Sequence, residues 1–221
     1  MGKIFRPQTI QEAVLAELRR LISDGELRPG TVIRLDAVAR ALEVSRIPVR
    51  EALKVLEGEG LVTHRPRGDY EVPSLRAEEI HEIYRLCALL ESEALHSLPG
   101  QPDEQDCAAA RAAIAAAERD LVAGDAKAFS GHAREFHKVT LRACAMPRLL
   151  RLLDGLWDTT ETYRPAKFVD SQEWATLQAE HRAMLAAFVG GDRMGLDEVT
   201  GRHREHLLAA TLRGTAPVSA S

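Results

Sequence analysis

Three histidines in the second half of the chain have the chemistry of a metal site. His137, His181 and His203 each fall within a separate predicted helix and have apolar residues nearby. Neutral imidazoles that converge from three helices can hold Zn²⁺ or a similar divalent ion. The alternative is that each is an isolated core or surface histidine with its own hydrogen bond. Both interpretations stay open on the residues alone.

A second group of residues has the chemistry of nucleic-acid binding. Arg46, Arg50 and Lys54 follow one another in steps of four, which places them on one face of a helix predicted over about residues 46–59. Three cations so close together repel one another unless a phosphate backbone or guanine edges reward the arrangement. The alternative is a solvated face balanced by neighbouring glutamates. Ser45 is the predicted N-cap of this helix.

The elements that precede this helix predict a helix-turn-helix. An amphipathic helix begins at a capping box formed by Thr9 and Glu12. A short helix follows over about residues 36–42, and a tight turn then leads into the cationic helix. Two short helices joined by such a turn are the geometry of a helix-turn-helix.

A β-hairpin is predicted behind the cationic helix. Strand-like segments at residues 61–65 and 69–72 flank Pro66-Arg67-Gly68, which gives the hairpin a basic tip. Such a wing can reach the DNA backbone or the minor groove beside a recognition helix. Residues 1–74 carry 12 Lys/Arg and 11 Asp/Glu, whereas the remainder carries 17 and 22, so the acidity lies behind residue 74.

Several motifs of this first domain resemble the signature of the GntR family of transcription regulators over about residues 8–73. They are Leu27-x-Pro29-Gly30, Val44 to Leu53, Leu56-x-x-Glu59-Gly60-Leu61-Val62 and Arg67-Gly68. The resemblance implies that Arg46 and Arg50 contact bases and that Lys54 lies nearby. It also implies a DNA-binding set that includes Ser45 and the wing residues Arg65, Arg67 and Gly68. Asp36 is a departure, because family members often carry a basic residue there.

The rest of the chain predicts an antiparallel bundle of about six helices. They are expected at residues 77–97, 102–123, 126–145, 148–163, 171–189 and 193–213. Pro and Gly residues separate them, and ligand sites in bundles lie between facing helices. The fold class is therefore mainly α, with a winged helix-turn-helix at 1–74, a helical effector-binding domain at 75–213 and a disordered tail at 214–221.

This second domain resembles the sensory, FCD-type domain of the FadR branch of GntR regulators. The resemblance rests on Glu135-Phe136-His137, Glu180-His181 and the segment from Gly191-Asp192 to His203. It implies a divalent metal, zinc or similar, held by an Asp and three His (His137, His181 and His203), with a carboxylate metabolite completing the site.

Two positions depart from that pattern. Ala133 stands where the metal-binding Asp is expected, and Cys87 stands where relatives usually carry an Arg that faces the ligand cavity. Loss of the carboxylate leaves three neutral donors, which still bind zinc in some proteins. Arg134 and Arg85 are candidates to replace the missing Arg as a carboxylate anchor. His206 is a reserve ligand on the helix of His203.

The expected function is a DNA-binding transcription regulator, a homodimer that reads operator DNA and responds to a small-molecule effector. One alternative is a metal-independent regulator that senses a bulkier apolar ligand. Another is a metal-dependent hydrolase fused to a DNA-binding domain, although no nucleophile motif or phosphate loop is present. Three widely spaced cysteines and the lack of a signal peptide or long apolar run suggest a cytoplasmic protein without a membrane partner.

Overall fold

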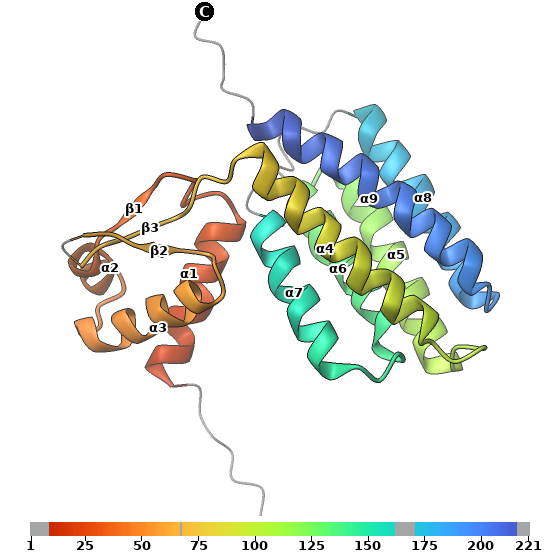
Figure 1. The fold of residues 1–221 in the computed structure, drawn as a ribbon, viewed down its shortest axis with the longest axis horizontal. Coiled ribbons are helices and arrows are strands. Elements are labelled where there is room, and N and C mark those ends of the chain that lie inside the picture. The colour runs from red at the N-terminus through yellow and green to blue at the C-terminus, as the bar shows by residue number, and fades with distance from the viewer. Residues whose placement is uncertain (1–8, 67, 162–170, 216–221) are drawn as a thin grey trace, which may run out of the picture. The chain divides into compact units, whose positions relative to one another are not determined.

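A computed structural model describes residues 9–66, 68–161 and 171–215 of the 221-residue chain. The chain folds into two compact units, residues 1–75 and 76–221 (Figure 1). Arg67 and the end of the expected tail, residues 216–221, lie outside the described part. The fold is mainly helical with one small sheet, as the sequence predicts.

The first unit packs three helices around one core. They are α1 (Ile10–Ser23), α2 (Leu35–Ala41) and α3 (Arg46–Gly58). The capping box is confirmed, because the Thr9 side chain accepts from Glu12 N–H while Glu12 accepts from Thr9 N–H. Leu18 on α1 and Leu53 and Leu56 on α3 are fully buried. Each such leucine stabilises the unit by roughly 1.5–3 kcal/mol, so the apolar stripe fixes which face of α3 points outward.

A three-stranded antiparallel sheet completes the unit, in the order β1-β3-β2. The strands β2 (Thr63–His64) and β3 (Tyr70–Glu71) form the expected hairpin. Gly68 lies near its tip with a φ of 92°, a backbone conformation that favours glycine. The additional strand β1 (Val32–Ile33) pairs with β3 and was not predicted, because two residues are too short to show an alternating pattern.

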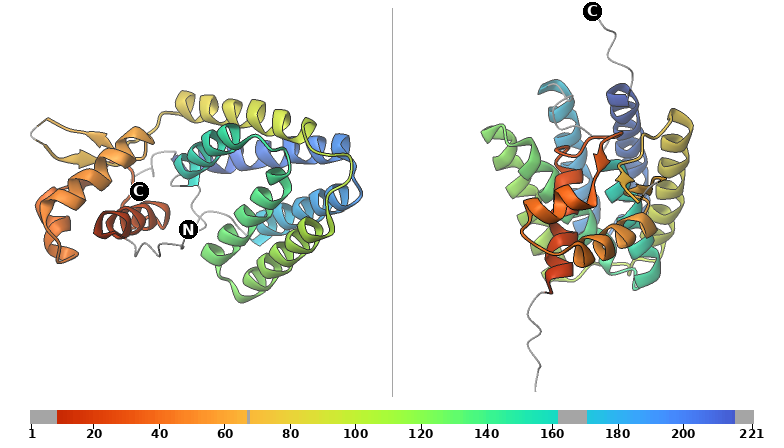
Figure 2. Two further views of the ribbon diagram at one scale, coloured as in Figure 1. Left: turned by 90° about the horizontal axis from the view of Figure 1, so that it is seen from below. Right: turned by 90° about the vertical axis from the view of Figure 1, so that its left-hand side faces the viewer.

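The second unit is a bundle of six described helices (Figures 1 and 2). They are α4 (Ala77–His96), α5 (Glu104–Ala123), α6 (Ala126–Arg142), α7 (Pro147–Glu161), α8 (Ser171–Val189) and α9 (Arg193–Thr215). Helix α5 packs against α6 and α8, whereas α4 packs against α7 and α9. The expected tail was placed two residues too early, because α9 continues to Thr215.

Phe136, Leu153 and Met184 form part of the bundle's core, and each is at most 1% exposed. The three cysteines are buried and free, as expected of small hydrophobic residues. None of the described helices is long and apolar enough to cross a membrane.

Candidate metal centre and nucleic-acid interface

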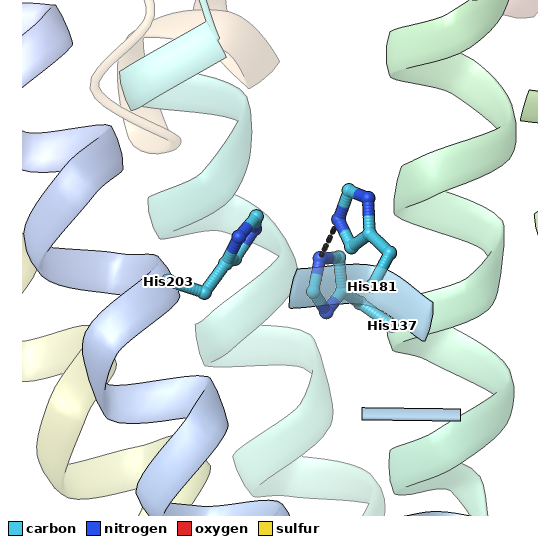
Figure 3. Close-up of side chains that lie close together, drawn as sticks. All are labelled: His137, His181 and His203. Carbon is cyan, nitrogen blue, oxygen red and sulfur yellow. Dashed lines mark hydrogen bonds between the residues drawn. The ribbon is translucent and has the colours of Figure 1, made fainter. Parts of the chain in front are cut away.

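The three predicted histidines come together inside the bundle. His137 lies on α6, His181 on α8 and His203 on α9, and Figure 3 shows their side chains converging. One ring nitrogen from each lies within 4.8 Å of the others, and the Nε2 atoms of His137 and His181 are 3.3 Å apart. His181 and His203 are only 2% and 3% exposed. Two of the three imidazole donors are therefore shielded from solvent, and His137 is partly buried.

Glu180 orients one of these imidazoles. Its carboxylate lies 2.9 Å from Nδ1 of His203 and also contacts Nδ1 of the exposed His206. Burial raises the pKa of Glu180, but its interactions with His203 and His206 outweigh this effect and the net pKa is lowered. An ionised Glu180 favours a proton on Nδ1 of His203, which leaves Nε2 with the lone pair that a metal needs.

A cavity of about 90 Å³ opens beside the three histidines. Its lining comes from helices α4, α6, α7, α8 and α9 and includes Phe129, Trp157, Trp174 and Leu177 as apolar walls. Ala133, one helical turn before His137, also lines it and is 8% exposed. Because alanine is smaller than aspartate, position 133 leaves extra space and provides no ligand atom where the family pattern places a carboxylate.

Arg134 lines the cavity, but carboxylates from α7 surround its guanidinium. Asp154 and Glu161 accept hydrogen bonds from it at 2.5 Å, and Asp158 lies 2.6 Å away. Burial lowers the pKa of Arg134, but these carboxylates more than compensate and raise it above the ordinary value. The Nη1 and Nη2 atoms of the guanidinium are thus already engaged, and a ligand carboxylate would have to compete for them.

The two other residues proposed for the cavity have different positions. Cys87 is 3% exposed and lines the cavity. Arg85, on the same helix, is exposed and is not among the lining residues. Helix periodicity explains the difference, since positions two apart point to nearly opposite faces.

Arg204 is a further cation of the cavity, and no local sequence pattern indicates it. It lies on α9 and forms an ion pair with Glu91 of α4, and both residues line the cavity. The indole N–H of Trp157 donates to Glu91 at 3.0 Å. One turn before Arg204, the buried Thr200 Oγ1 has no hydrogen-bond partner among the described residues. These groups form a polar wall, which was missed because Glu91 and Arg204 are 113 positions apart.

The outer face of α3 carries the predicted nucleic-acid contacts. Arg46, Arg50 and Lys54 are all exposed, and the exposed face of α3 also includes Ile47, whereas the buried residues Val49, Ala52, Leu53 and Leu56 face the core. Ser45 is the N-cap residue by position, but its side chain makes no capping hydrogen bond. Its hydroxyl is therefore not committed to the helix end. The arrangement presents a row of cations at the start and middle of an exposed helix.

Acidic neighbours contact most of these cations. Asp36 pairs with Arg46, Glu51 with Lys54 at 3.1 Å, and Glu71 with Arg65 of the wing at 3.1 Å. Within the described part of the first unit, Arg50 has no ion-pair partner. Exposed ion pairs of this kind are weak, so a phosphate or a base edge can replace the acidic partner.

Comparison with known proteins identifies the family to which a chain with these two units belongs. Residues 10–72 match the family described as bacterial regulatory proteins, gntR family. Residues 82–206, more than half of the chain, match the FCD domain. The chain belongs to the GntR family. It is a DNA-binding transcriptional regulator with a GntR domain followed by an FCD domain.

Relatives of this GntR regulator are also regulators of transcription. The HTH-type regulator YdhC of Bacillus subtilis is 25% identical over 185 residues, which cover 83% of this chain and 82% of YdhC. A gluconate operon transcriptional repressor of the same species is 38% identical over 79 residues, 36% of this chain and 32% of the repressor. The structure of Escherichia coli McbR/YncC has a TM-score of 0.80 at 21% identity and covers 93% of this chain and 98% of that one, which shows a shared fold.

Proposed function

We propose that this GntR regulator belongs to the FadR branch and that a small carboxylate, bound at a metal in the helical unit, controls its affinity for operator DNA. The observation that carries the proposal is the convergence of His137, His181 and His203 beside a cavity. The DNA-binding half of the proposal rests on the exposed cations of α3 and the wing. Repression relieved by the effector is the expected outcome.

The separation of two of the three histidines suits zinc. Two nitrogens bound to one tetrahedral Zn²⁺ at 2.0–2.1 Å lie roughly 3.3–3.4 Å apart. The Nε2 atoms of His137 and His181 already have this separation, at 3.3 Å. Glu180 supplies the outer hydrogen bond that metal-binding histidines commonly make. With three protein ligands, a bound zinc ion keeps a fourth position that a carboxylate oxygen can take.

The size of the cavity favours a small effector over a bulky one. Its volume of about 90 Å³ lies far below the 300–1,000 Å³ of sites for drug-sized ligands. Thr200 Oγ1 is buried without a hydrogen-bond partner among the described residues, whereas most buried polar groups bond to protein or ordered water, so this hydroxyl is available to a polar effector. Arg204 also lines the cavity, and its guanidinium can pair with a ligand carboxylate that displaces Glu91.

The DNA-binding unit reads sequence through α3 and fixes register through the wing. We assign base contacts to Arg46 and Arg50, and backbone contacts to Lys54 and Arg65. Further backbone contacts are assigned to Ser45, Arg67 and Gly68. A homodimer would place two such units on the half-sites of one operator.

The experiment measures how metal and carboxylates change DNA affinity. An operator is first selected from random duplexes, and its affinity is then compared for metal-free protein, zinc-loaded protein, and zinc-loaded protein with acetate, malonate or lactate. We expect at least one acid to change the affinity of the zinc-loaded protein but not that of His137→Ala. An effect that persists without metal would contradict the metal site and favour a metal-independent ligand. No effect of any acid would contradict the effector class.

A further inference from the structure

An ion pair joins the starts of the two helices of the helix-turn-helix. Asp36, in the first turn of α2, contacts Nε of Arg46, the first residue of α3. Both side chains are exposed, at 57% and 62%. Arg46 is also the first member of the cationic row on α3. A carboxylate therefore lies where DNA would approach one of the proposed base-contacting residues.

The carboxylate and a DNA phosphate compete for the same guanidinium. DNA without a cognate sequence offers Arg46 little but phosphate oxygens, and the gain comes mainly from the counterions released. To make that contact, Arg46 must leave Asp36, and the freed carboxylate then repels the DNA. A guanine edge accepts two hydrogen bonds from the guanidinium in a fixed geometry. It therefore compensates for the loss of Asp36 better than a phosphate does.

Arg50 provides the internal contrast. It lies one turn further along the same face of α3 and has no ion-pair partner within the described part of this unit. It is thus available to any DNA, whereas Arg46 is available only to a contact that outweighs Asp36. The two side chains are chemically identical, but before DNA binds Arg46 is paired with a carboxylate, whereas Arg50 has no such partner within the described part of this unit.

From these contacts we infer that Asp36 determines specificity by holding Arg46 away from the phosphates of non-cognate DNA. This inference rests on the proposed base contact of Arg46. Its physical consequence is a lower affinity for random DNA and a higher ratio of specific to non-specific binding. The ratio matters because non-cognate sites far outnumber operators in a genome.

The test compares the affinity for a random-sequence duplex at several salt concentrations. Asp36→Asn should bind about two- to fivefold tighter than wild type, the range that an exposed ion pair is worth. The slope of log affinity against log salt should steepen by about 0.9, the value of one added phosphate contact. Affinity for the selected operator should rise less, so the specificity ratio falls.

Two further variants separate this effect from net charge. Glu26→Gln removes the same charge from the same unit, but Glu26 pairs with Arg20, outside the cationic row. The Glu26→Gln variant should leave the slope of log affinity against log salt unchanged. In an Arg46→Ala background, Asp36→Asn should give no further gain, since Asp36 acts through Arg46.

Three outcomes would overturn the inference. Equal effects of Asp36→Asn and Glu26→Gln would show that only net charge matters. A gain that survives in the Arg46→Ala background would show that Asp36 acts by another route. If Arg46→Ala keeps wild-type affinity for both DNAs, the proposed base contact of Arg46 is wrong, and the inference fails with it. In the first two cases a weakened operator complex of Arg46→Ala would leave the proposed function standing.

Discussion

At the scale of single residues, Glu180 supports the proposed metal site through one hydrogen bond to His203. Its carboxylate holds Nδ1 of His203 and so leaves Nε2 as the nitrogen available to a metal. Ala133 cannot contribute a ligand, so the site depends on how well three histidines are held in place. The outer hydrogen bond therefore matters more here than it would in a site with four protein ligands.

Replacing Glu180 by Gln should weaken zinc binding by about 10- to 100-fold, because the outer carboxylate that sets the tautomer and orientation of His203 is lost. Competition with a coloured chelator measures the affinity. Glu198→Gln is the matched control on α9, where its side chain is 73% exposed. A Glu180→Gln variant with wild-type zinc affinity would contradict the role of this hydrogen bond.

Arg50 is the residue on which sequence-specific DNA binding should depend most directly. Arg50→Ala should weaken binding to the selected operator by about 1–3 kcal/mol if a bidentate contact to a base is lost. Electrophoretic shift or fluorescence anisotropy measures this change. Arg119→Ala removes an exposed cation from α5 in the other unit and should have no effect. Operator binding unchanged by Arg50→Ala would refute the assignment.

At the scale of elements, a buried leucine packs α7 into the core of the bundle. Leu153 is 0% exposed, whereas its neighbour Leu152 is 62% exposed. Leu153→Ala should lower the free energy of unfolding by about 2–5 kcal/mol, because it removes buried contacts and leaves a cavity. Leu152→Ala, with the same chemical change, should cost far less.

Urea denaturation followed by tryptophan fluorescence measures this difference. The two tryptophans of the chain, Trp157 and Trp174, both lie in the helical unit, so their signal reports the unfolding of that unit. Similar losses of stability for the two alanine variants would show that the packing of α7 differs from the structure described here.

The helices were predictable from the sequence because their boundaries are marked by local signals. Capping residues begin several of them, and Gly or Pro residues separate the six helices of the bundle. The three histidines fall on separate predicted helices, but they could be selected as a set only because they match the pattern of FadR-branch sensory domains. Strand β1 could not be predicted, since Val32 and Ile33 are too few to form a pattern.

The partners of charged side chains could not be predicted either. Arg134 was proposed as a ligand anchor, but three acids of α7 surround it. Arg204 and Glu91, which do line the cavity, become neighbours only when α9 packs against α4. Ion pairs between distant helices depend on tertiary packing, which no local sequence pattern records.

At the scale of the whole molecule, the proposed reading of two half-sites requires two DNA-binding units. Sedimentation should give twice the 24.3 kDa chain mass at the concentrations at which the operator is bound. The protein–DNA complex should contain two chains for each operator. A monomer that binds its selected operator with full affinity would contradict the dimer.

The most direct test of the account is the metal content of protein purified without an affinity tag or chelator. Elemental analysis of wild type should give about one divalent ion per chain. The His137→Ala/His181→Ala variant should contain none, while circular dichroism shows that its helices remain. Wild-type protein without metal, even after zinc is added, would contradict a three-histidine centre, and the cavity would then bind its effector by direct contacts alone.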